Sequence, residues 1–166
     1  MSYQYIYNPD IISKDKWLEY VRSHPKGNIF QTPQMYEVYK KANNYTPVFV
    51  CCVNGENDIR GILLSSIFSE KSGLAKKIVS RSISVGAPLL SDEVHHSEFL
   101  KKYINEVQGD AVYSRLVNLF DNREDMKSIQ DAGFKYNDHL NYIINLALGE
   151  SELWSKLHNT RRRQIK

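Results

Sequence analysis

The sequence has few of the features that mark secreted or membrane-spanning proteins. Only two of its 166 residues are cysteine. Cys51 and Cys52 are adjacent in an apolar run, so their side chains should point to opposite faces of a strand and cannot readily bond each other. They form neither a disulfide framework nor the CxxC spacing of a zinc site, which favours buried, reduced thiols and a cytoplasmic protein.

Long apolar runs and helix-breaking residues are also scarce. The longest apolar run, Val48 to Val53, is far shorter than the roughly 18 to 20 residues that cross a bilayer. Met1 to Lys16 contains no basic stretch followed by an apolar run, so a secretory signal is not expected. The 8 Gly and 5 Pro residues argue against a fibrous or disordered chain, and the length suits one globular domain.

No strong excess of charge of either sign is present. The formal net charge is +3, but Arg161, Arg162, Arg163 and Lys166 supply four of the positive charges at the end of the sequence. Any attraction for phosphate is therefore expected to be local rather than a property of the whole surface. A solvated helix end would explain the same residues.

The hydrophobic pattern predicts alternating strands and helices. Strands are expected at residues 3–7, 46–53, 59–68, 78–85, 113–120, 134–136 and 139–148, and helices at 14–22, from 33 to about 42, at 93–107, and from a cap at Asp121 or Asn122 to just before Gly133. Thr32 is expected to cap the helix that starts at Pro33, and Asn54-Gly55 signals an antiparallel hairpin. This order predicts an α/β fold with a mixed central sheet flanked by helices.

Familiar catalytic and cofactor motifs are missing. The sequence has no GxSxG turn, no GxxxxGK[ST] and no GxGxxG, and no Cys stands at a helix start with a partner His. His95 and His96 are adjacent, so on a helix they lie about 100° apart and cannot both face one metal ion. From motifs alone the catalytic residues stay unknown, and we expect no metal and no cofactor.

The order of elements resembles that of the GNAT (acyl-CoA N-acyltransferase) fold. In acetyl-CoA users of that fold, a Gln/Arg-x-x-Gly-x-Gly/Ala loop holds the pyrophosphate at a helix start. The nearest approach here, Arg81 to Ala87, has the wrong spacing. The strand-to-helix junction is expected at Leu119 to Glu124, where carboxylates would repel an anion, so acetyl-CoA binding is not expected.

Five segments together resemble the first half of FemAB-family proteins, the aminoacyl-transferases that build peptidoglycan cross-bridges from aminoacyl-tRNA and a cell-wall precursor. They are Asn28 to Lys40, Gly61-Ile-Leu, Val85 to Leu90, Asp131-Ala-Gly-Phe, and Leu153 to Lys166. Such proteins contain two GNAT-like halves. The resemblance implies a GNAT-like domain in residues 1–150, and in residues 151–166, with Ser151 as cap, the start of a helix that leads toward a second half.

The resemblance also implies which residues bind substrate. Lys40 matches a family lysine that contacts precursor phosphate, Gln31 and Tyr36 match positions before it, and Arg162 leads toward the second half. Each residue also has a structural explanation, since Lys40 would complement the helix dipole, and Gln31 and Tyr36 would serve as helix-entry and core residues.

The function expected from the resemblance is precursor binding by an acyltransferase or aminoacyl-transferase half that is inactive by itself. Its partners would be an amine acceptor and the second half, with aminoacyl-tRNA bound only when both halves are present. Two alternatives stay open. One is a single-domain protein with a basic tail, and the other is a non-catalytic module that uses some of its eleven tyrosines to hold a partner.

Overall fold

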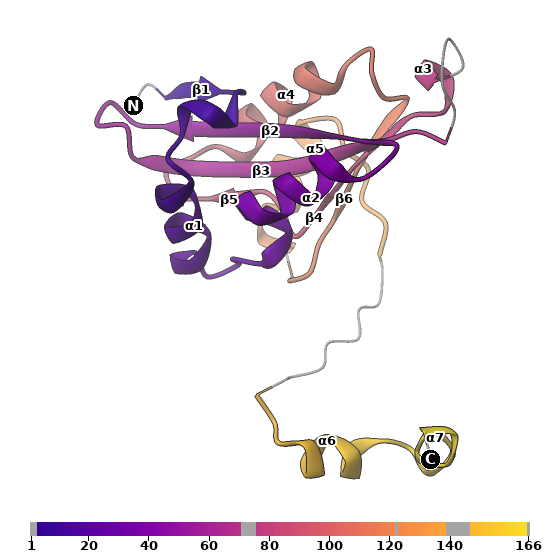
Figure 1. The fold of residues 1–166 in the computed structure, drawn as a ribbon. Helices are drawn as coiled ribbons and strands as arrows, with labels where there is room; N and C mark the ends of the chain where they lie inside the picture. The colour runs from indigo at the N-terminus through magenta and orange to yellow at the C-terminus, as the bar shows by residue number, and fades with distance from the viewer. Residues whose placement is uncertain (1–2, 71–75, 122, 139–146, 166) are drawn as a thin grey trace. The chain divides into compact units, whose positions relative to one another are not determined.

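The computed structural model of the chain describes residues 3–70, 76–121, 123–138 and 147–165. They fall into two compact units, Met1–Tyr136 and Asn137–Lys166 (Figure 1). Each unit is described by itself below.

A mixed six-stranded sheet forms the centre of the first unit. Its strands are β1 (Gln4–Ile6), β2 (Tyr45–Val53), β3 (Ile59–Phe68), β4 (Arg81–Val85), β5 (Leu89–Leu90) and β6 (Tyr113–Val117). The main order is β1-β2-β3-β4-β6, and β5 pairs with β3 beyond the end of the β3–β4 pairing. All pairs are antiparallel except β4–β6, which is parallel. This confirms the mixed α/β architecture predicted from the hydrophobic pattern.

The helices of the first unit flank this sheet. They are η1 (Pro9–Ile11), α1 (Lys14–Ser23), η2 (Ile29–Gln31), α2 (Pro33–Lys41), α3 (Lys76–Val79), α4 (His96–Val107), η4 (Arg123–Asp125) and α5 (Met126–Asp131). The Thr32 side chain caps α2 by accepting a hydrogen bond from the Met35 N–H at 3.3 Å. Ser13 caps α1 in the same way, through the Lys16 N–H.

Alternating residues of β2 point into two separate cores. Phe49, Cys51 and Val53 pack with Trp17 and other residues of the α1 and α2 side. Val48, Val50 and Cys52 pack on the opposite face, against α4. The two thiols are thus free, buried and on opposite faces, as their adjacency in a strand predicts.

The start predicted for the fourth strand is wrong, whereas the hairpin lies where the sequence predicts it. The segment before β4 is the short helix α3, and β4 begins only at Arg81. The hairpin connection spans Asn54 to Asp58, and its positive φ of 62° is at Asn57 rather than at Gly55. The Asn54 side chain explains this loop, because its oxygen accepts hydrogen bonds from the N–H groups of Glu56 and Asp58.

The strand predicted at residues 134–136 is also wrong. Helix α5 ends at Asp131, Gly133 two residues further on has a φ of 98°, and the Phe134 N–H bonds back to the Ile129 carbonyl at 3.3 Å. This helix-ending turn directs Phe134 onto the core instead of into the sheet. Most of the strand predicted at 139–148, and the alternative cap Asn122, lie outside the described residues.

In its described residues, the second unit contains two helices where the sequence predicts one. They are α6 (Glu150–Lys156) and α7 (Asn159–Ile165). The cap of α6 is Gly149, two residues earlier than the predicted Ser151, and Leu157 adopts an extended conformation that separates the helices.

Candidate functional site

The parallel strands β4 and β6 define one end of the sheet as the candidate site. They pair in register from Arg81 with Tyr113 to Val85 with Val117, and α4 forms the crossover between them. In sheets of this kind, ligands bind outside the carboxyl ends of the parallel strands. The relevant strand-to-helix junction is therefore the β4–α4 connection, residues 86–95, and not the Leu119 to Glu124 segment expected from the sequence.

A tight turn opens this connection. Gly86 has a φ of 64°, and the Asn28 side chain donates hydrogen bonds to the carbonyls of Gly86 at 2.7 Å and of Lys26 at 3.1 Å. A Cβ atom at Gly86 would overlap the Asn28 side chain. The Ala87–Pro88 peptide bond that follows is cis, and Ala87 has no positive φ.

The Gln31 side chain bridges strands β3 and β4 where their backbone pairing stops. Strands β3 and β4 pair only between Ser66–Phe68 and Arg81–Ile83, and the gap beyond is filled by the fully buried Gln31 side chain. Its amide nitrogen donates to the carbonyls of Leu64 at 3.0 Å and Val85 at 2.8 Å, and its oxygen accepts from the Leu64 N–H at 2.7 Å. Gln31 therefore replaces the missing pairing between the two strands.

Three charged or titratable side chains meet at this end from remote parts of the sequence. Lys26 Nζ lies 3.1 Å from Asp125 Oδ2, and His96 Nε2, in the first turn of α4, lies 3.6 Å from the same oxygen. The Asp125 and His96 side chains are only 20% and 23% exposed. Burial lowers the pKa of His96 most strongly; Lys26 lowers it further, whereas Asp125 raises it. A neutral imidazole beside a carboxylate can accept a proton from an amine.

Sequence reasoning missed this group. The sequence pattern assigns no role to His96, Asp125 or Lys26. The pair of Lys26 and Asp125 is 99 positions apart in sequence, so no local spacing connects them. The sequence contains only one usable signal, which is the position of a histidine at the start of a helix.

The structure places the four predicted substrate residues in different surroundings. Gln31 is internal, as described. Tyr36 and Lys40 are one helical turn apart on α2, where Tyr36 is half-buried with its ring 6.2 Å from that of Trp17, and Lys40 is exposed. Arg162 belongs to the second unit, where its guanidinium donates to the carbonyls of Leu157 at 2.8 Å and Ser155 at 2.9 Å at the end of α6. Their roles in substrate binding stay predictions.

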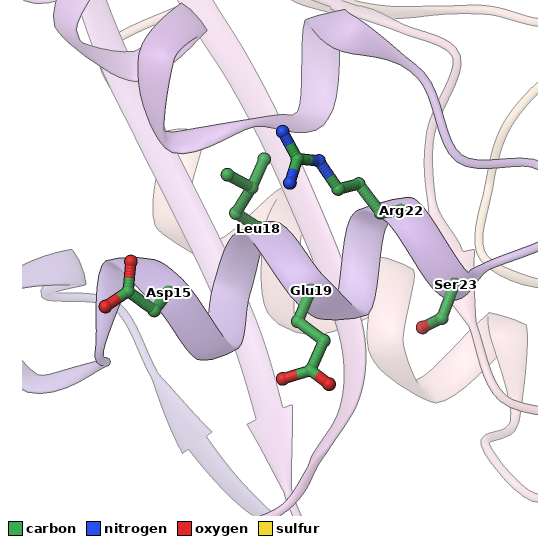
Figure 2. Close-up of a pocket in the computed structure, with 5 residues that line it drawn as sticks. All are labelled: Asp15, Leu18, Glu19, Arg22 and Ser23. Atoms are coloured by element: carbon green, nitrogen blue, oxygen red, sulfur yellow. The ribbon is translucent and has the colours of Figure 1, made fainter.

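An open hollow of about 440 Å³ runs along α1 and is lined by Asp15, Leu18, Glu19, Arg22 and Ser23. Figure 2 shows Leu18 and Arg22 on one side of the helix and Glu19 on another. All of its lining residues come from one helix, so it brings together no catalytic groups from separate elements.

Two further searches cover the described part of the chain. Within the ranges given above, no group of three or more His, Cys, Asp or Glu side chains is arranged to hold a metal ion. Among the helices of those ranges, none is long and apolar enough to span a bilayer.

Comparisons with known proteins identify the fold. No protein-family model and no curated protein matches the sequence. Solved structures do match. An aminoglycoside 6'-N-acetyltransferase from Acinetobacter baumannii is 12% identical, with 87% of this chain and 98% of that chain covered and a TM-score of 0.56. An acetyltransferase from Clostridium acetobutylicum, solved with acetyl-CoA, is 14% identical, with 88% and 97% covered and a TM-score of 0.54.

A third match is ribosomal-protein-alanine N-acetyltransferase from Brucella melitensis, at 8% identity, 88% and 100% coverage and a TM-score of 0.51. Identities this low show the fold alone. The chain has the GNAT-like α/β fold of these acetyltransferases, which confirms the predicted fold class. The matches do not single out the FemAB family.

Proposed function

We propose that this chain is the acceptor-binding half of an acyltransferase or aminoacyl-transferase of the FemAB type, acting on a cell-envelope precursor. Two observations support this proposal: the fold it shares with acetyltransferases, and the FemAB-like segments from Asn28 to Lys166. In this proposal residues 1–150 form one lobe of a two-lobed cleft, and this lobe binds the acceptor but does not complete the reaction by itself.

The observation that carries the proposal is that three backbone N–H groups of the β4–α4 connection are already used within the chain. The N–H groups of Gly86, Ser91 and Val94 already donate within the chain, to the carbonyls of Val117, Arg60 and Ser91 at 2.8, 2.8 and 2.9 Å. Pro88 has no N–H, and Asp92 and Glu93 add carboxylates to the same connection. A donor held by its pyrophosphate, such as acetyl-CoA, is therefore disfavoured there, whereas an aminoacyl ester does not need this contact.

The chemistry required is attack of an amine on an activated ester, which depends on positioning and proton removal rather than on a covalent nucleophile. In this proposal the neutral imidazole of His96 takes the proton that the attacking ammonium group must lose, and Asp125 keeps the ring in place. Lys40, on the exposed face of α2 beside Tyr36, contacts the phosphate of the precursor. Arg162 lies in the segment that leads toward the second lobe.

Calorimetry with two ligands tests the proposal. We expect no binding of acetyl-CoA at micromolar concentration, and binding of a uridine-diphosphate-linked muramyl-pentapeptide precursor. Lys40→Gln should weaken precursor binding at least tenfold, because a hydrogen bond to a charged group contributes about 1.5–3 kcal/mol.

Lys16→Gln, which removes an exposed lysine from α1, is the matched control and should bind the precursor normally. Micromolar binding of acetyl-CoA would overturn the proposal. Absence of precursor binding, or equal weakening in both lysine variants, would contradict the acceptor assignment.

A further inference from the structure

The loop that follows α1 holds the backbone of Lys26 from both sides. The Lys26 N–H donates to His24 Nδ1 at 3.1 Å, and the Lys26 carbonyl accepts from the Asn28 side chain at 3.1 Å. Both of these side chains also contact other parts of the first unit. His24 Nε2 lies 3.1 Å from the Leu90 carbonyl oxygen, and Asn28 donates to the Gly86 carbonyl at 2.7 Å. The loop therefore fixes the position from which the Lys26 side chain reaches the candidate site.

Asp125 is hydrogen-bonded to Lys26, whereas His96 is only close to it. Lys26 Nζ donates to Asp125 Oδ2 at 3.1 Å. His96 Nε2 lies 3.6 Å from the same oxygen, which is beyond hydrogen-bonding range. The Lys26 side chain is 38% exposed and that of Asp125 is 20% exposed, so water screens this ion pair only in part. The carboxylate thus has a cationic partner without a proton on His96.

The charges of this group balance when His96 is neutral. The Lys26 ammonium and the Asp125 carboxylate have a net charge of zero, and a proton on His96 would add an unbalanced positive charge to a partly buried group. Charged groups that are shielded from water are costly unless opposite charges compensate them. Without Lys26 the carboxylate would be unpaired, and a proton on His96 would then restore neutrality. The presence of Lys26 therefore favours the neutral imidazole.

Few other charged side chains act on His96. Burial lowers its pKa most strongly, and Asp125 and Lys26 are the charged groups that change the pKa further. Helix α4 packs against β2, which contains no charged residue, and against α5. The other titratable residues of η4, of α5 and of the start of α4 are exposed, where water screens their charges. They are His95, Glu98, Arg123, Glu124, Lys127 and Asp131.

We propose that Lys26 is a positioning residue of the candidate site, which keeps Asp125 paired so that the imidazole of His96 stays uncharged and able to take up a proton. This role rests on the proposed acyl transfer, because only a neutral imidazole can accept the proton that the attacking amine loses. Lys26 acts through Asp125 and not on the acceptor.

A pH titration of His96 by NMR in the full chain tests this role and needs no substrate. The signal of His96 is identified by its loss in His96→Gln. Lys26→Met should move the titration midpoint of His96 upward by about one pH unit, because the unpaired Asp125 then stabilises the imidazolium. Lys26→Arg keeps the positive charge and should retain the wild-type midpoint. If Lys26→Met does not fold, Lys26→Gln makes the same test with a neutral side chain that can still donate to Asp125.

Two comparisons separate this role from a general effect of charge. Lys127→Met removes an exposed lysine from α5, close in sequence to Asp125, and should leave the His96 midpoint unchanged. The second comparison repeats Lys26→Met in the background of Asp125→Asn. If Lys26 acts through Asp125, the substitution should shift the midpoint less in this background than in the wild type. Thermal melting checks that each variant is folded.

Three results of the titration would contradict the inference. An unchanged or lower midpoint in Lys26→Met would show that Lys26 does not favour the neutral form of His96. Equal shifts with and without the Asp125 carboxylate would show that Lys26 acts on His96 directly. An equal shift in Lys127→Met would indicate a general effect of surface charge. None of these results bears on the calorimetric test of the proposed function, and a failure to bind the precursor would leave the titration unaffected.

Discussion

Replacing the buried side chain of Gln31 should show how much of the free energy of unfolding depends on its amide group. In Gln31→Leu the volume is nearly kept, but the hydrogen bonds to Leu64 and Val85 are lost. The Leu64 carbonyl keeps a partner, because the Ser84 hydroxyl donates to it at 2.7 Å. The Leu64 N–H and the Val85 carbonyl lose the partner that Gln31 supplies.

The expected cost follows from these two groups. A buried polar group without a partner costs about 1–3 kcal/mol, so the substitution should lower the unfolding free energy by about 2–6 kcal/mol. That is a large part of the roughly 5–15 kcal/mol that stabilises a typical domain. For a chain of this size, a loss of about 3 kcal/mol lowers Tm by roughly 6–12 °C.

Urea unfolding and thermal melting followed by circular dichroism measure this loss. Gln34→Leu is the matched control, since Gln34 is exposed on the neighbouring helix α2 and its replacement should change stability by less than about 0.5 kcal/mol. If Gln31→Leu were neutral or stabilising, Gln31 would only fill space, and its bridging role would be refuted.

Gln31→Glu provides a second, pH-dependent measurement. An ionised glutamate can accept from the Leu64 N–H but cannot donate to the Leu64 and Val85 carbonyls. Burial raises the pKa of a carboxyl group, so its protonated form, which can donate, is favoured at low pH. Relative to the wild type, this variant should therefore lose less stability at pH 4 than at pH 7. Equal losses at both values would contradict this account.

Three further predictions concern the candidate site. Because burial holds the pKa of His96 below its ordinary 6.5, the unfolded chain takes up this proton first as the pH falls, and stability decreases below about pH 6.5. His96→Gln should flatten that decrease in urea melts at pH 7.5 and 5.0; identical slopes would contradict it. Asp125 raises the pKa of His96, so Asp125→Asn should lower it in an NMR titration, and an unchanged or higher value would refute their contact. Gly86→Ala should cost about 1–2 kcal/mol of unfolding free energy because of its positive φ and the nearby Asn28, whereas Gly55→Ala, with no neighbour within 4 Å, should stay within about 0.5 kcal/mol; equal effects would refute the strain.

The local features of this protein follow from the sequence by itself. The caps at Ser13 and Thr32, the two faces of β2 and the existence of the hairpin each depend on residues only a few positions apart. Side-chain capping and strand alternation act over this range, so the pattern of residues is enough to predict them. The order of elements was sufficient to predict the GNAT-like fold.

The arrangement of the candidate site was decided only by the tertiary structure. The parallel pairing of β4 with β6 moved the strand-to-helix junction to residues 86–95, and the gap between β3 and β4 gave Gln31 its bridging position. Lys26 and Asp125 meet although they are 99 positions apart, and with His96 they form a group that no spacing in the sequence indicates. Hydrogen bonds and ion pairs act over a few ångströms in space. Distance along the chain therefore says little about them until the sheet has brought the strand ends together.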